Sequence, residues 1–218
     1  MSSQQKEQLL GMSIRSIVLN EDQRSVAFSE CHALGLILYC RENTRLRIDR
    51  RVSRRTVLQT TMADIDYTVP YAEAKLEPSQ ISYRVAVWIL DALELQAAGM
   101  PPGCFTLTLD GDSTCSEIFQ TLVQRDTAWQ TAIDLCLERD ILPALAWDVR
   151  RRDSRNLGGR NEWYLFEAFP QAIEDILAGR SIVKCTFGLG DAWGETCDVE
   201  RFIEENKSKT MDEWREAW

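Results

Sequence analysis

A short segment near the middle of the chain carries the residue types that phosphoryl chemistry uses. In "LTLDGDST", Asp110 ends an apolar stretch, and Asp112 follows it two positions later. Paired carboxylates can hold a magnesium ion, and one of them can attack a substrate while the other transfers a proton. A later segment, "FGLGDAWGE", supplies Asp191 after another apolar stretch. These three aspartates define a candidate magnesium-dependent active site.

The D-x-D-x-T spacing of Asp110, Asp112 and Thr114 resembles the first motif of the haloacid dehalogenase phosphatases. In that family the first aspartate attacks phosphorus, the second acts as general acid and base, and magnesium bridges them. The segment around Asp191 is similar to the late metal-binding motif of the family, and Lys184 could serve as its phosphate-binding lysine. The resemblance covers these two strings and implies a magnesium-dependent phosphatase.

The same residues also fit a purely structural role. Thr114 and Glu117 have the spacing of a T-x-x-E capping box, and residues 110–113 are turn formers that begin a helix. We favour this capping role and therefore assign no catalytic residue, no metal and no cofactor. The set Asp110, Asp112 and Asp191 stays as the alternative.

Two segments concentrate positive charge in a chain whose formal charge is −9. Residues 41–55 and 150–160 together hold twelve arginines against three acids. The planar guanidinium donates two parallel hydrogen bonds to a carboxylate or phosphate, so the clusters could bind an acidic partner. We favour solvated side chains that protect a sheet edge, with binding of an acidic partner or of the chain's own acidic tail as the alternative. The candidate binding arginines are Arg45, Arg47, Arg51, Arg54, Arg151, Arg152 and Arg155.

Alternation in "TRLRIDRRV" predicts how the first cluster is displayed. A strand here places Leu46 and Ile48 on a buried face, with Arg45 and Arg47 on the opposite, solvent-facing side. The remainder of the chain is strongly acidic and repels nucleic acids and membrane surfaces. Charge therefore favours a protein partner over a nucleic acid or a membrane.

The segment "MDEWREAW" at the end of the printed sequence has a helical pattern. Met211, Trp214 and Trp218 recur at helical spacing among acidic residues, which places them on one face. Such a face usually docks on its own domain. It can instead anchor a partner, because tryptophan is favoured at fully desolvated interfaces. We favour self-docking of this face, and Trp214 and Trp218 stay as candidate binding residues in the alternative.

The predicted elements place strands first and helices later. Short β-branched segments predict strands at 13–20, 25–30, 34–40, 44–50 and 55–61, with a hairpin around Asn43. Further on we predict helices at 79–98, 113–124, 127–139 and 170–179, strands at 104–109, 142–149, 162–169 and 181–187, and a C-terminal helix. This order predicts an α+β fold: an antiparallel β-rich part, 1–76, packed with a mixed part, 77–218, or one continuous domain.

Composition and motifs together lead to a functional hypothesis. The 218 residues are 44% hydrophobic and contain no apolar run long enough to cross a bilayer, which predicts a soluble, cytoplasmic protein. The seven cysteines include no C-x-x-C and lie mostly in apolar segments, which favours buried free thiols over a disulfide framework. We expect a non-catalytic protein of the inhibitor or immunity type that binds another protein. The alternatives are the phosphatase and a nucleotide or nucleic-acid binder that uses the arginine clusters.

Overall fold

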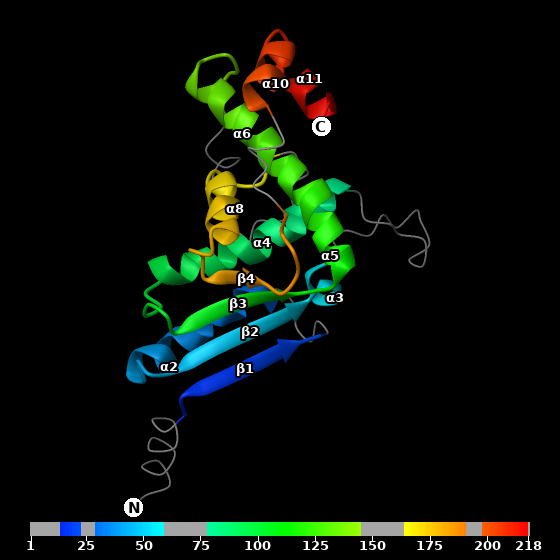
Figure 1. Cartoon of the computed structure of the whole chain (residues 1–218). Helices are drawn as coiled ribbons and strands as arrows, with labels where there is room; N and C mark the ends of the chain where they lie inside the picture. The colour runs from blue at the N-terminus through cyan, green and yellow to red at the C-terminus, as the bar shows by residue number, and fades with distance from the viewer. Residues whose placement is uncertain (1–13, 23–28, 59–77, 145–163, 191–197, 218) are drawn as a thin grey trace, which may run out of the picture.

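The computed structural model describes residues 14–22, 29–58, 78–144, 164–190 and 198–217. Its centre is a four-stranded sheet made of β1 (Ser16–Glu21), β2 (Arg47–Ser53), β3 (Phe105–Asp110) and β4 (Val183–Cys185). The strands lie in sequence order, and every neighbouring pair is parallel (Figure 1). The fold is therefore α/β, and the prediction of an α+β fold with an antiparallel N-terminal part is wrong.

The N-terminal hairpin is replaced by a helical crossover. The segment predicted as the strand at 34–40 forms the end of the 3-10 helix η1 (Ser29–Leu36) and most of α2 (Ile37–Glu42). A short apolar run does not by itself distinguish a strand from a buried helix. Here Ile37 and Cys40 are buried while the two residues between them are exposed, which is a helical pattern. Parallel strands need such a crossover, and β1 pairs with β2 in that way.

Three other predicted strands also differ or fall outside the described residues. The strand at 25–30 lies mostly outside them, and its last two residues belong to η1. The strand at 55–61 begins instead in α3 (Arg54–Val57), and its end lies outside the described residues. Of the strand at 142–149, only the first three residues are described, and they form no strand.

The predicted strand at 162–169 is an irregular buried segment in its described part. Tyr164, Leu165 and Phe166 are all buried, which a strand with only one covered face does not allow. The amide of Gln130 takes the place of a neighbouring strand. Its oxygen accepts a hydrogen bond from the Leu165 N–H, and its nitrogen donates to the Phe166 carbonyl.

The helical predictions are confirmed with small changes in their bounds. The 79–98 helix is α4 (Pro78–Ala97), and the one after Phe169 is α8 (Phe169–Leu177). The two helices predicted at 113–124 and 127–139 form one run, comprising α5 (Ser113–Ile118), the π-helical turn η4 (Phe119–Val123) and α6 (Gln124–Glu138). The C-terminal helix is two helices, α10 (Val199–Asn206) and α11 (Met211–Ala217).

One face of the sheet carries the main core. Crossovers of one hand between successive parallel strands place their helices on the same side, and α4 and α8 lie together above the sheet in Figure 1. Ile48, Val52 and Leu107 share one core cluster with residues of η1, α2, α4 and α8. The sheet pairs β2, which lies before residue 77, with β3, which lies after it.

A second, smaller core lies at the far end of α6. There α6 packs against α10 and α11 through aromatic side chains that include Trp129, Phe202 and Trp214. None of the helices in the described part of the chain combines the length and the apolar character needed to cross a membrane.

Candidate functional site

The strand that carries the first arginine cluster has the predicted alternation. Leu46 and Ile48 are buried, whereas Arg45 and Arg47 are exposed, so this prediction is confirmed. The same alternation carries Arg50 to the covered face, where it is only 3% exposed. The cluster is therefore divided between the two faces of the sheet.

Two arginines of the cluster donate hydrogen bonds to backbone carbonyls. Arg41 donates from Nε to the Gly99 carbonyl at 3.0 Å and from Nη2 to the Ala98 carbonyl at 3.1 Å. These carbonyls follow the end of α4, where a cation complements the helix dipole. Arg47 donates to the carbonyls of Thr44 and Leu46, both at 2.9 Å. Both side chains thus contribute to the positions of neighbouring segments.

Three further arginines pair with carboxylates of the same chain. The nitrogen–oxygen distance is 2.7 Å for Arg50 with Glu21, 2.7 Å for Arg51 with Asp49, and 3.4 Å for Arg54 with Asp112. The Arg50 guanidinium also lies over the Trp88 ring, 4.9 Å from its centroid. Much of the positive charge of the cluster is therefore balanced inside the fold.

Only Arg45 and Arg55 of the first cluster have exposed side chains without a hydrogen bond or ion pair to another described residue. The predicted binding residues Arg151, Arg152 and Arg155 lie outside the described residues. The internal contacts of the other five arginines give the first cluster a structural role. They leave Arg45 and Arg55 as the arginines of this cluster most available to a partner.

The D-x-D-x-T segment connects the end of β3 to α5. An Asp110 carboxylate oxygen accepts a hydrogen bond from the Thr186 hydroxyl at 2.7 Å. Asp112 is the N-cap of α5 and accepts from the Cys115 N–H at 3.2 Å. That hydrogen bond holds the pKa of the Asp112 carboxyl below its ordinary value. A cap is present, but Asp112 provides it, and the predicted box with Thr114 as the cap is not formed.

The candidate metal set is incomplete in the described part of the chain. There, no group of three histidine, cysteine, aspartate or glutamate side chains comes close enough together to hold a metal ion. Asp191, the third member of the proposed magnesium set, lies outside the described residues. Asp110 ends β3 and Asp112 caps α5, and both carboxylates already accept hydrogen bonds from the protein.

The C-terminal tryptophan face docks on its own chain. Trp214 is 1% exposed, and its ring lies 5.4 Å from that of Trp129 and 5.5 Å from that of Phe202, centroid to centroid. Its indole N–H donates to the Asn206 carbonyl at 3.2 Å. Trp214 is therefore a core residue, as self-docking predicts. Its side chain is not available on the surface of this chain to bind a partner. Trp218 lies outside the described residues.

A surface that our predictions from the sequence did not include lies at the amino end of the sheet. Every large hydrophobic side chain that is exposed within the described ranges belongs to residues 14–39. Leu38 is 67% and Tyr39 63% exposed, both on α2. The Asn43 side chain donates to the Ile14 carbonyl at 2.8 Å and so ties the end of α2 to the residues before β1. We call Ile14, Arg15, Leu38, Tyr39 and Arg45 the amino-end surface.

The sequence signal for this surface was present but ambiguous. "LILYC" predicts a buried strand when it is read with a period of two, and helical spacing would have exposed Leu38 and Tyr39 together. Arg15 and Arg45, the two charged members of this surface, are exposed, and their side chains make no hydrogen bond or ion pair within the described ranges. The amino-end surface thus combines three exposed apolar side chains with two exposed arginines.

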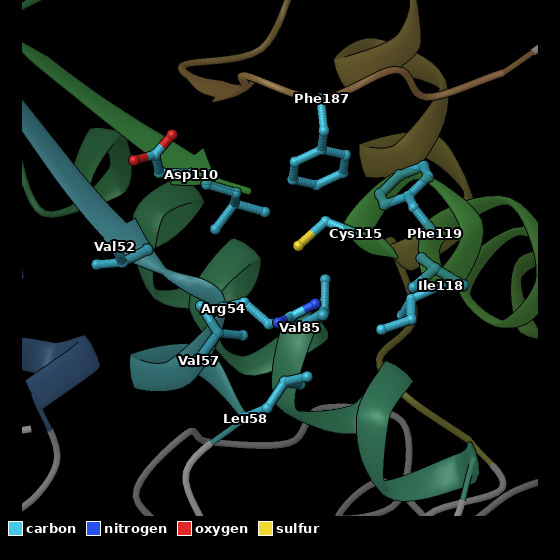
Figure 2. A pocket seen from close by; sticks show the side chains of 12 residues that line it. Val52, Arg54, Val57, Leu58, Val85, Asp110, Cys115, Ile118, Phe119 and Phe187 are labelled. Atoms are coloured by element: carbon cyan, nitrogen blue, oxygen red, sulfur yellow. The ribbon is translucent and has the colours of Figure 1, made fainter. Parts of the chain in front are cut away.

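A small cavity lies at the opposite, carboxyl end of the strands (Figure 2). Its volume is about 50 Å³. In Figure 2 the Arg54 side chain reaches in among the lining residues, and the Cys115 sulfur faces the same space, while the Asp110 carboxylate is turned away. The lining residues are Val52, Arg54, Val57, Leu58, Val85, Leu109, Asp110, Cys115, Ile118, Phe119, Val123 and Phe187.

Comparison with known protein families, curated proteins and solved structures finds no match to this chain.

Proposed function

We propose that this chain is a non-catalytic protein-binding protein whose partner, another protein, covers the amino-end surface. The supporting observation is the gathering of exposed large hydrophobic side chains in one part of the described chain. When a partner covers such side chains, the free energy of removing apolar surface from water is favourable by roughly 25 cal/mol per Å². An inhibitor or immunity-type protein needs such a surface and needs no catalytic group.

The chemistry of the amino-end surface specifies the partner. Leu38 and Tyr39 offer apolar area, and tyrosine is among the residues enriched at binding hot spots. Arg15 and Arg45 add positive charge that no described side chain balances. Exposed ion pairs contribute only about 0–1 kcal/mol each, so apolar contact supplies most of the affinity. The expected partner therefore presents an apolar patch with an acidic rim.

The test begins with the full chain, tagged and isolated from cells of its own host. A stoichiometric protein partner is identified and purified, and its dissociation constant is then measured by calorimetry. Leu38→Ser combined with Tyr39→Ser should weaken binding at least about thirtyfold, as expected for hot-spot residues. Arg45→Glu should weaken it less and mainly slow association.

Arg201→Glu is the matched control for Arg45→Glu. Arg201 lies on α10 and pairs with Glu205 in an exposed ion pair, remote in sequence from the amino-end surface. It should leave the affinity unchanged. The proposal is wrong if the double variant binds the partner as tightly as the native chain. It is also wrong if only nucleic acid co-purifies, or if sedimentation velocity shows that a second copy of this chain is the sole partner.

A further inference from the structure

The two edges of the sheet are unlike. The strand order places β1 at one edge and β4 at the other, and β1 is the lowest strand in Figure 1. β4 has three residues, with the exposed Lys184 at its centre, and both a short strand and a lysine protect a sheet edge. β1 has six residues, and residues 16–20 include neither a charge nor a proline. Such an unprotected edge is a template on which another strand can pair.

The backbone register of β1 identifies the groups that are left for such pairing. The Arg47 N–H donates to the Arg15 carbonyl at 2.9 Å. Because alternate residues of a strand direct their backbone groups to opposite sides, the odd-numbered residues of β1 bond to β2. The N–H and carbonyl groups of Ser16, Val18 and Asn20 therefore point away from β2. Among the strands of the described residues, none pairs with them.

The side chains along this edge are largely apolar on both faces of the sheet. Val18 is 50% exposed, and it lies beside Asp49 on the face opposite the main core. Ile17 and Leu19 are partly buried and pack against that core on the covered face. Unpaired backbone groups with alternating apolar side chains are matched by an extended strand of the same kind.

We propose that this edge pairs with β1 of a second copy of the chain, antiparallel about a two-fold axis at Val18. The register sets Val18 opposite its own counterpart, Ser16 opposite Asn20, and Ile17 opposite Leu19. Each outward-pointing N–H then meets an outward-pointing carbonyl of the other copy. Both copies use the same edge, so the pairing closes as a dimer and does not continue into a fibre.

The charges at the two ends of β1 fit the same register. Arg15 lies opposite Glu21 of the second copy. Glu21 accepts from Arg50 and is still 28% exposed, and a carboxylate has room for a further donor. Moving the axis one or two residues toward either end sets Arg15 or Glu21 opposite Ile17 or Leu19 instead. The strand is therefore self-complementary in charge and in apolar contact when it is centred on Val18.

This inference goes beyond the proposed function, because it rests on a strand edge and not on the α2 side chains Leu38 and Tyr39. The two share Arg15, which gains Glu21 of the second copy as a partner in the dimer and leaves Arg45 as the free charge of the amino-end surface. A dimer that binds no other protein would support this inference and overturn the proposed function. A chain that binds a protein partner but stays monomeric would do the reverse.

The first test measures the association of the full native chain. Sedimentation velocity across micromolar concentrations should show a monomer converting to a species of twice the mass. Hydrogen exchange by NMR then locates the contact: the amides of Ser16, Val18 and Asn20 should exchange more slowly as the dimer forms, whereas the Ile17 amide, already bonded to β2, should change little. A chain that is monomeric throughout overturns the inference. So does a dimer in which these three amides exchange at the monomer rate.

Substitutions at Val18 test the axis. Val18→Pro removes the N–H that points to the second copy, keeps the bonds to β2, and is of a kind tolerated at sheet edges. It should weaken the dimer at least about tenfold, because symmetry removes a hydrogen bond from each copy. Val18→Thr is the matched control, since it keeps the N–H and the branched side chain, and should weaken the dimer about twofold at most.

A further variant keeps the test decisive if Val18→Pro does not fold. Val18→Lys places a charge at an exposed position and sets two like charges opposite each other at the axis. It should also weaken the dimer at least about tenfold while circular dichroism stays native. Native dimerisation by a folded Val18→Lys or Val18→Pro chain overturns the inference.

Discussion

The guanidinium of Arg50 and the carboxylate of Glu21 form two parallel hydrogen bonds between β2 and β1, 2.7 Å from Nε and 2.9 Å from Nη2. Arg50 is 3% exposed, while the Glu21 side chain remains 28% exposed. The Trp88 ring of α4 packs over the guanidinium. An arginine that the sequence offers as part of a surface cluster thus belongs to the interface between the sheet and its helices.

Removing either partner of this pair should destabilise the fold, and by unequal amounts. Glu21→Ala removes a carboxylate partner from a buried guanidinium that cannot lose its proton, which should lower the free energy of unfolding by up to about 3–5 kcal/mol. Arg50→Met should cost less, since Glu21 can be hydrated. Urea unfolding measures both variants, with Arg51→Met, in an exposed pair, as a control of small effect. Equal, small effects for all three variants would contradict a structural role for Arg50.

Trp214→Ala should remove about 3–5 kcal/mol of stability, as expected for a buried aromatic side chain. The aromatic contacts with Trp129 and Phe202 are lost with it, so the near-ultraviolet circular dichroism should also change. Thermal unfolding gives the magnitude, and Glu216→Ala, at an exposed position of the same helix, is the control. An unchanged melting temperature would mean that α11 does not contribute to the core.

Asp110→Asn should have no catalytic consequence, because an asparagine oxygen can still accept the Thr186 hydrogen bond. We expect no magnesium-dependent hydrolysis of p-nitrophenyl phosphate by the native chain. Asp140→Asn is the matched control, at an exposed position whose φ of 54° asparagine tolerates. Magnesium-dependent turnover that only Asp110→Asn abolishes would instead support the phosphatase alternative.

The partly buried Cys185 thiol should react slowly in the folded protein. Burial, with a smaller effect from the Cys115 thiol, raises the pKa of Cys185 to about 12. At pH 8 only about one molecule in ten thousand then carries the reactive thiolate. Peptide mass spectrometry should show slow alkylation of Cys185 by iodoacetamide, faster as the pH rises and fast in urea. Equal rates in folded and unfolded protein would contradict the burial of this thiol.

The sequence alone determined those elements whose pattern has a single interpretation. The 20-residue α4 has enough turns for its apolar period to be unmistakable, and β3 and β4 follow from short β-branched segments between clear breaks. Alternation over 45–48, where β2 begins, also placed Leu46 and Ile48 inside and Arg45 and Arg47 outside. These features depend on the local period of side chains, which the chain carries with it whatever its neighbours are.

Tertiary structure decided what the local period leaves open. The run at 34–40 becomes helical because β1 and β2 pair in parallel and need a crossover, a constraint set by residues far away in the sequence. That choice exposes Leu38 and Tyr39 together. Arg50 and Arg54 differ in role because Glu21 and Trp88 meet the buried Arg50, while Arg54 stays exposed and pairs with Asp112. Composition gives the number of charges, and only the packing of distant segments decides which of them face a partner.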